Sequence, residues 1–404
     1  MEPPIQTLAG RHYQTGQPIT IHHQNGLITE IQPLESSQPH LLPFLAPPLF
    51  DLQVNGFAGV DFQQDNVSQD QLHQACQGLL AAGCTRFLLT LITDAWPRLT
   101  QRLAHLHQLV RRSQLASSMV AGWHIEGPFL SNQPGFHGAH PPEQTTDPSP
   151  AAVDQIREIT GQDHVLLTLA PERKNSTRTI EHALNLGLKI SLGHTNATSR
   201  ELQSAISAGA SCFTHLGNAC PQQLDRHDNI LWRILDQLRP RAGDTKPPGR
   251  FHATLIPDEH HVSPALFRII HAASAPHTLM YTSDAMAGAA APPGPTTLGQ
   301  LHLNIGEDGI ARQPGKTNFA GSTLKPFEGV FHASRMLQAP WHECWDRFST
   351  LPAKWMNLPP HNLQPGQPAS ACLLDFSRNS TLPDLTAVFL NGQQTLESSK
   401  HLRH

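Results

Sequence analysis

Residues 122–128 read GWHIEGP, and this stretch decides the fold. Side chains alternate along a β-strand, so Trp123 faces one side of the strand while His124 and Glu126 face the other. A Gly-Pro pair then ends the strand, because proline cannot donate a hydrogen bond to a neighbouring strand. The stretch therefore predicts a strand that carries two polar side chains at its C-terminal end.

The same kind of unit recurs along the central part of the chain. An apolar stretch ends on a polar residue, and a helix-like stretch follows in many cases, as at residues 71–83 and 198–209. Each of these two helical segments ends in a glycine, a common way to close a helix. Eight strand-like stretches can be recognised: FDLQVNG (50–56), TRFLLTLIT (85–93), AGWHIEGP (121–128), HVLLTLAPE (164–172), LKISLGHT (188–195), SCFTHLGN (211–218), RFHATLIPD (250–258) and TLMYTSDA (278–285).

Alternating strands and helices predict an α/β fold with a parallel sheet. Eight units fit a (β/α)8, TIM-like barrel, whose active sites lie at the C-terminal ends of the strands. The alternative is a doubly wound sheet, but nothing in the chain resembles its G-x-G-x-x-G nucleotide fingerprint. We assign residues 48–359 to the barrel.

Both ends of the chain carry short strand-like stretches. PITIHHQ and GLITEIQPL flank a turn near the N-terminus, and SACLLDF and TAVFLNG lie near the C-terminus. Residues 34–48 are rich in proline and serine and predict a linker. We expect residues 1–47 and 360–404 to form one small domain that the barrel interrupts.

Composition narrows the class of protein. The chain has 404 residues and a formal net charge of −4, without a basic block, so nucleic acid and anionic membranes are not expected partners. No apolar run approaches the roughly 18 residues of a membrane span. The first residues lack a signal-peptide pattern, and the six cysteines form no C-x-x-C pair. These features predict a cytoplasmic protein with reduced cysteines.

Four polar residues lie at the ends of the predicted barrel strands. Glu126 follows the third stretch, His194 the fifth, His215 the sixth and Asp284 the eighth. In a barrel these ends converge on one mouth. Two imidazoles and a carboxylate form the ligand set of a catalytic zinc-like site, and Asp284 remains as a free carboxylate that can move a proton.

At this point the chain resembles the N-acetylglucosamine-6-phosphate deacetylases of the amidohydrolase superfamily. The resemblance spans nearly the whole chain, and the pair HIEGPF and GAH is specific to the family. It rests on FDLQVNGFAGVDF (50–62), HIEGPFLSNQPGFHGAH (124–140), LTLAPE (167–172), SLGHTNAT (191–198), THLGNACP (214–221), TSDAMAG (282–288) and FAGSTL (319–324). The family combines a metal-bearing barrel with a small β-sandwich made from both termini.

The resemblance implies roles for the residues at the barrel mouth. Glu126, His194 and His215 match the metal ligands of the family. Asp284 matches the catalytic aspartate, and His140 matches the histidine that helps to hold the substrate's amide carbonyl.

Further residues match the family's substrate contacts. Asn218 and Ala219 match a turn that gives backbone contacts to the sugar phosphate, and Arg226 matches the phosphate-binding arginine. His261 matches a histidine of the seventh strand. Ser322 is either a substrate-binding loop hydroxyl or a turn residue.

The chain departs from the family pattern in two places. Gly217 and Cys220 replace bulkier residues, and PDEHH replaces the D-G-x-H of the seventh strand. Either His260 or His261 can take the family histidine's role, and spacing favours His261. These departures concern substrate contacts and leave the preferred sugar open.

The first barrel strand predicts how many metal ions bind. Its period of two places Asp51, Gln53 and Asn55 on one face. Many amidohydrolases have H-x-H here, and those imidazoles build a second metal position. A neutral amide is a weak ligand for a zinc-like ion, so Gln53, which matches the family position near the metal, is expected to act outside the ligand set. We predict one divalent ion per chain, zinc, with Fe²⁺ or another divalent ion as the alternative.

The resemblance implies removal of acetate from N-acetylglucosamine 6-phosphate to give glucosamine 6-phosphate. A metal-activated water attacks the acetamide carbonyl, with Asp284 as general base and then acid. One alternative is a deacetylase of another amino sugar phosphate, such as N-acetylgalactosamine 6-phosphate. Another is a catalytically silent sugar-phosphate-binding relative, which the intact set of Glu, His, His and Asp disfavours. The family also suggests a homodimer.

Overall fold

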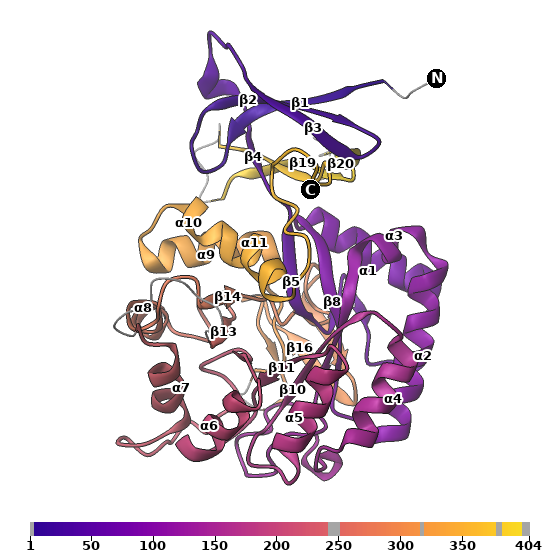
Figure 1. The fold of residues 1–404 in the computed structure, drawn as a ribbon, viewed down its shortest axis with the longest axis vertical. Coiled ribbons are helices and arrows are strands. Elements are labelled where there is room, and N and C mark those ends of the chain that lie inside the picture. The colour runs from indigo at the N-terminus through magenta and orange to yellow at the C-terminus, as the bar shows by residue number, and fades with distance from the viewer. Residues whose placement is uncertain (1–3, 241–250, 316–318, 377–381, 398–404) are drawn as a thin grey trace. The chain divides into compact units, whose positions relative to one another are not determined.

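The computed structural model of the protein describes residues 4–240, 251–315, 319–376 and 382–397 (Figure 1). The chain forms two compact units. One consists of Met1–Asp51, Gln77–Arg86 and Pro326–His404, and the other of Leu52–Cys76 and Phe87–Lys325. This division differs from the domain limits expected from the sequence, which stay a prediction.

An eight-stranded parallel sheet forms the barrel, and its strands arise at the eight stretches expected from the sequence. The segment after the last strand returns to the first, since Val54 forms a parallel bridge with Ala285. The (β/α)8 prediction is therefore confirmed. In sheet order the strands are β5 (Leu49–Val54), β8 (Cys84–Ile92), β9 (Val120–Glu126), β10 (His164–Leu169), β11 (Lys189–Leu192), β12 (Cys212–Phe213), β13 (His252–Leu255) and β14 (Leu279–Tyr281).

Helices lie outside these strands (Figure 1). The α7 helix shows why: it buries Ile230, Ile234 and Leu238, which recur every four residues on one face. The predicted helix at 198–209 begins at the capping box of Thr198 and Glu201. The helices are α1 (Gln69–Ala81), α2 (Trp96–Arg112), α3 (Gln114–Met119), α4 (Pro150–Thr160), α5 (Ser176–Asn185), α6 (Ser199–Ser207), α7 (Ile230–Leu238) and α8 (Pro264–Ala273).

A three-stranded antiparallel sheet follows the last barrel strand and was not expected from the sequence. It consists of β15 (Gly294–Leu298), β16 (Leu301–Ile305) and β17 (Ala311–Arg312). The Asp61 carboxylate fixes its first turn by accepting hydrogen bonds from Thr297 Oγ1 at 2.8 Å and Gly299 N at 2.9 Å. Asp61 itself ends a two-stranded ribbon of β6 (Gly56–Phe57) and β7 (Val60–Asp61).

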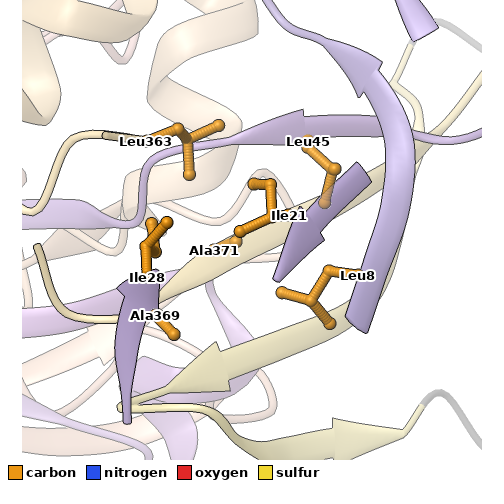
Figure 2. Packing of buried hydrophobic residues seen from close by; sticks show 7 residues of the cluster. All are labelled: Leu8, Ile21, Ile28, Leu45, Leu363, Ala369 and Ala371. Atoms are coloured by element: carbon orange, nitrogen blue, oxygen red, sulfur yellow. The ribbon is translucent and has the colours of Figure 1, made fainter. Parts of the chain in front are cut away.

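A seven-stranded sheet combines both ends of the chain, as the predicted β-sandwich requires. Side chains from its N-terminal and C-terminal strands meet in one hydrophobic cluster (Figure 2). In sheet order the strands are β20 (Gln393–Glu397), β19 (Asp384–Leu390), β18 (Ala371–Asp375), β4 (Phe44–Ala46), β1 (Gln6–His12), β2 (Pro18–Gln24) and β3 (Leu27–Pro33).

The linker predicted at residues 34–48 is wrong in part, because β4 (Phe44–Ala46) lies within it. Leu45 is fully buried in the cluster of Figure 2, and β4 pairs with both β1 and β18. Three apolar residues between prolines are too few to show a strand period. Burial and pairing, rather than local pattern, make this segment a strand.

Three further helices belong to the unit that contains both termini. They are α9 (Pro326–Leu337), α10 (Trp341–Trp345) and α11 (Thr350–Trp355). Trp345 Nε1 donates to Pro47 O at 2.8 Å, and Tyr13 donates to Asp346 at 2.7 Å, so these helices hold the N-terminal segment of the same unit.

The expectation of unpaired cysteines is confirmed for all six. Five are buried and Cys220 is half-buried. None of the helices in the described part of the chain is long and apolar enough to cross a membrane.

Candidate active site

A cavity of about 870 Å³ opens at the C-terminal ends of the barrel strands. Its floor is polar, because the strand ends contribute carboxylates, imidazoles and amides rather than apolar side chains. The residues that follow the strands and line it include Asn55, Thr93, Glu126, His194, His215 and Asp284.

Glu126 is the centre of this floor. Its Oε1 lies 2.8 Å from His215 Nε2 and 3.2 Å from His194 Nε2, and its Oε2 lies 3.4 Å from His140 Nε2. Side chains alternate along β9, so Glu126 faces the cavity while Trp123 lies on the other face of the strand. There Trp123 Nε1 donates to Asp163 at 3.0 Å. All four of the clustered side chains are at least 95% buried.

The glycine after Glu126 is needed for space. Gly127 has φ +86°, and a Cβ atom at this position would lie 2.1 Å from Thr93 Oγ1. That hydroxyl is hydrogen-bonded to His140 Nδ1 at 2.8 Å. Any side chain at residue 127 would displace the group that holds His140, which explains the Gly-Pro break at the strand end.

His194 presents a lone pair to the cluster. Its Nδ1 lies 3.1 Å from Phe136 O, and a carbonyl oxygen can only accept, so Nδ1 carries the proton. In the neutral ring Nε2 then has a free lone pair, directed toward Glu126. This is the usual arrangement of a metal-ligating histidine.

His140 has the opposite tautomer. The backbone N–H of Thr93 donates to His140 Nδ1 at 3.3 Å, so in the neutral ring the proton lies on Nε2. His140 Nε2 therefore offers a donor to the cluster, whereas His194 Nε2 offers an acceptor. The tautomers therefore distinguish a hydrogen-bond donor, His140 Nε2, from a nitrogen that could bind a metal, His194 Nε2, although both rings lie beside the same carboxylate.

Burial and neighbouring charges shift the pKa values in this cluster. Burial raises the pKa of Glu126, but the effect of the three neighbouring imidazoles outweighs it, so the pKa lies well below its usual range. Burial lowers the pKa of His194 to about 4. His215 is buried as well, yet Glu126 raises its pKa. The carboxylate is thus ionised and ready to neutralise a cation.

Asp284 is the second carboxylate of the cavity floor. Burial and the charge of Glu126 raise its pKa to about 6. Asn55 Nδ2 donates to its Oδ1 at 2.7 Å, and Ser322 N donates to its backbone carbonyl at 3.0 Å. Asp284 is therefore fixed in place while it can exchange a proton near neutral pH.

Three functional residues have left-handed backbone conformations. The φ angles are +51° at His194, +34° at His215 and +53° at Asp284. For residues other than glycine this conformation costs roughly 1–3 kcal/mol, and such strain gathers at functional sites. Their surroundings must hold these residues firmly.

The sugar-phosphate residues expected from the sequence lie partly in the cavity. Asn218, Ala219 and His261 line it, and Asp258 holds the His261 ring with an Oδ2 to Nδ1 distance of 2.5 Å. His260 is exposed and does not line the cavity, which favours His261 of the two candidates.

Three expected residues do not line the cavity. Arg226 is exposed on the loop before α7, and Gln53 is buried. Ser322 is also buried, and its hydroxyl accepts from Leu324 N at 2.8 Å, as a turn residue does. The structure thus favours the turn interpretation of Ser322.

Sequence reasoning missed two residues that hold the candidate catalytic groups. Asn55 binds Asp284, and Thr93 binds His140. Both follow barrel strands directly, so their place at strand ends was the available signal. Neither residue type is a usual metal ligand or base. The candidates chosen from the sequence were acids and histidines at strand ends, so these two residues were not selected.

The side chains fit a divalent metal ion. Among the residues that the structure describes, the ligand atoms of Glu126, His140 and His194 lie within 4.8 Å of one another, and His215 Nε2 contacts the same carboxylate. Imidazole nitrogen and carboxylate oxygen are ligands of zinc-like ions. Because His140 donates from Nε2 in its neutral form, Glu126, His194 and His215 remain as the candidate ligand set.

Comparisons with known proteins indicate the family of the chain. No family model matches the chain. N-acetylglucosamine-6-phosphate deacetylase of Danio rerio is 32% identical over 284 residues, 69% of this chain and 67% of that protein. N-acetylgalactosamine-6-phosphate deacetylase of Escherichia coli O157:H7 is 27% identical over 354 residues, 87% of this chain and 89% of that protein.

The fold is shared with solved structures. A mutant N-acetyl-D-glucosamine-6-phosphate deacetylase of Mycobacterium smegmatis, in complex with N-acetyl-D-glucosamine-6-phosphate, aligns with a TM-score of 0.84 and 25% identity over 98% of this chain and 100% of that chain. The chain belongs to the N-acetylglucosamine-6-phosphate deacetylase family and is a hydrolase.

Proposed function

We propose that the protein removes the acetyl group of N-acetylglucosamine 6-phosphate by metal-dependent hydrolysis of its amide bond. The observation that carries the proposal is the arrangement at the cavity floor. One low-pKa carboxylate and two imidazoles form a cation site there, and a separate carboxylate with a raised pKa stands beside it.

Glu126, His194 and His215 would hold the metal. A divalent cation bound there, zinc with Fe²⁺ or another divalent ion as the alternative, would polarise the amide carbonyl and lower the pKa of water. We propose one such ion per chain. Gln53 is buried outside the cavity lining and remains assigned to a supporting role rather than to the ligand set.

Asp284 acts as the proton carrier. In its ionised form it takes a proton from the attacking water, and it then gives this proton to the departing amine, which is a poor leaving group when uncharged. The hydrogen bond from Asn55 orients the carboxylate for both transfers. Burial and the charge of Glu126 raise the pKa of Asp284, which favours its taking up the proton.

His140 stabilises the charge that develops on the carbonyl oxygen. Its tautomer places the proton on Nε2, at the cavity floor, while Thr93 holds the ring from behind. A fixed donor aimed at a developing oxyanion commonly contributes on the order of 10²-fold to the rate.

The sugar phosphate contacts Asn218, Ala219 and His261 in this proposal. These three residues line the cavity. Arg226 remains assigned to the phosphate, because a guanidinium offers a planar fork to phosphate oxygens. We also propose a homodimer. The exposed position of Arg226 fits a phosphate contact made in that assembly.

N-acetylgalactosamine 6-phosphate is the second candidate substrate. The relative from Escherichia coli O157:H7 carries that name, and Gly217 and Cys220 alter the cavity wall where the sugar would lie. We further propose a cytoplasmic location, consistent with six unpaired cysteines.

A panel of N-acetyl sugars tests the proposal. Acetate release is measured with N-acetylglucosamine 6-phosphate, its galacto epimer and the unphosphorylated sugars, before and after removal and return of metal. We expect the highest kcat/KM with the gluco 6-phosphate, and loss of activity in chelator that metal restores. Higher kcat/KM with the galacto epimer would select the second candidate, and activity that survives complete metal removal would contradict the mechanism.

A further inference from the structure

A chain of buried hydrogen bonds crosses the barrel interior at the level of the residues that precede the candidate ligands. His124 Nδ1 lies 3.1 Å from Leu52 O, and His124 Nε2 lies 2.8 Å from Thr168 Oγ1. Thr168 Oγ1 lies 2.9 Å from Thr214 Oγ1, which lies 2.7 Å from Ser191 Oγ. The four side chains of this chain are at most 2% exposed.

The donors and acceptors of this hydrogen-bond chain follow one fixed order. Leu52 O can only accept, so His124 Nδ1 donates, and Nε2 of the neutral ring must accept. Thr168 then gives its single hydroxyl proton to His124 and accepts from Thr214. Thr214 in turn accepts from Ser191. Every group in the chain depends on its neighbour, so removal of one hydroxyl leaves a buried polar atom without its partner.

Each end of this hydrogen-bond chain lies close in sequence to a candidate ligand. His124 is two residues before Glu126 on the same face of β9, and Thr214 directly precedes His215. Ser191 on β11 is three residues before His194. The hydrogen-bond chain therefore connects the strand ends that carry the three candidate ligands, although these strands are not all neighbours in the sheet.

The two threonines also shape the backbone before His194. A Cβ atom on Gly193 would lie 3.0 Å from Thr168 Cγ2 and 3.1 Å from Thr214 Cβ. The backbone at residue 193 is thus pressed against the hydroxyl chain. The strained residue His194 follows at once, and His215 follows Thr214 directly.

We propose that the Ser191–Thr214–Thr168–His124 chain preorganises the metal site by holding the strained ligand backbones in one arrangement before the ion arrives. Thr168 and Thr214 are positioning residues in this account, since neither lines the cavity. The inference rests on the proposed metal site of Glu126, His194 and His215. A site held rigid without its ion loses less order on binding, so the hydroxyl chain adds to metal affinity.

Thr168→Val tests the inference, because it keeps the shape of the side chain and removes the hydroxyl in the middle of the chain. Zinc-loaded protein is mixed with excess chelator, and the rate of metal release is followed by a colour change. We expect release on the order of tenfold faster or more, the usual size of effects from residues that support metal ligands. Thr168→Ser, which keeps the hydroxyl, should restore most of the retention.

Thr179→Val is the matched control. Thr179 is fully buried in α5 (Ser176–Asn185), and its hydroxyl makes no hydrogen bond within the described residues. The substitution is chemically the same but lies outside the hydroxyl chain. It should leave the rate of metal release unchanged, and thermal unfolding in chelator shows whether either valine variant merely loosens the fold.

Ser191→Ala keeps the test open if Thr168→Val does not fold. It removes only the donor at the end of the chain, so metal release should be faster than in the unsubstituted protein but slower than in Thr168→Val. Equal metal release in the Thr168→Val and Thr179→Val variants would overturn the inference. Metal release from Thr168→Ser as fast as from Thr168→Val would overturn it too, since packing of the methyl group, and not the hydroxyl, would then explain how the metal is retained. A native protein that binds no metal would instead overturn the proposed function.

Discussion

Two buried carboxylates of the cavity floor have pKa values shifted in opposite directions. Glu126 is held in its charged form by the imidazoles around it, while burial and the charge of Glu126 raise the pKa of Asp284 to about 6. Pairs of acids whose surroundings separate their pKa values commonly divide the work between electrostatic support and proton transfer. Glu126 accordingly suits the ion, and Asp284 suits the proton.

Asp284→Asn should lower kcat by at least about 10²-fold, the usual contribution of a general acid–base group. The amide is nearly the same size, so metal content and substrate affinity should stay close to normal. Steady-state kinetics together with metal analysis of the variant would check this. Near-normal turnover would contradict the role of Asp284.

The pH profile provides the control for that variant. Asp284 accepts a proton only when ionised, so activity should fall as the pH drops through its pKa, about 6 without the ion and lower when a cation favours the charged form. This acidic limb should be missing from the residual activity of Asp284→Asn.

Individual strands were predicted well where their period was long enough to see. β9 (Val120–Glu126) and the other seven barrel strands appear where apolar runs end on polar residues. β4 (Phe44–Ala46) was missed, and so was the sheet of β15 to β17. β4 has only three residues, and its pairing with β1 and β18, which a local pattern does not contain, makes it a strand.

The contribution of burial in the seven-stranded sheet can be tested at β2. Ile21 on β2 (Pro18–Gln24) is 1% exposed and belongs to the cluster of Figure 2. Ile21→Ala should lower the free energy of unfolding by about 2–5 kcal/mol through lost burial and the cavity left behind. Urea unfolding would measure it.

Ile5→Ala is the matched control for this substitution. Ile5 is 62% exposed, so the same change should alter the unfolding free energy by no more than about 0.5 kcal/mol. If the two variants lose similar amounts, the cluster does not stabilise this unit in the way described.

The candidate site could be anticipated because a closed barrel brings its strand ends to one mouth. That rule placed Glu126, His194, His215 and Asp284 together although they are spread over more than a hundred residues of sequence. The same rule says nothing about contacts beneath the mouth. The hydrogen-bond chain from Ser191 to Leu52 depends on which side chains of several strands face inward, and only the folded barrel reveals this.

The number and place of the metal ions test the whole account most directly. Crystals of carefully prepared protein would be measured on both sides of the absorption edge of the bound metal, together with metal analysis in solution. We predict one ion per chain, about 2.0–2.2 Å from ligand atoms of Glu126, His194 and His215, with Gln53 outside its coordination sphere. Two fully occupied positions with Gln53 bound to one of them, or no ion between these three side chains, would contradict the account.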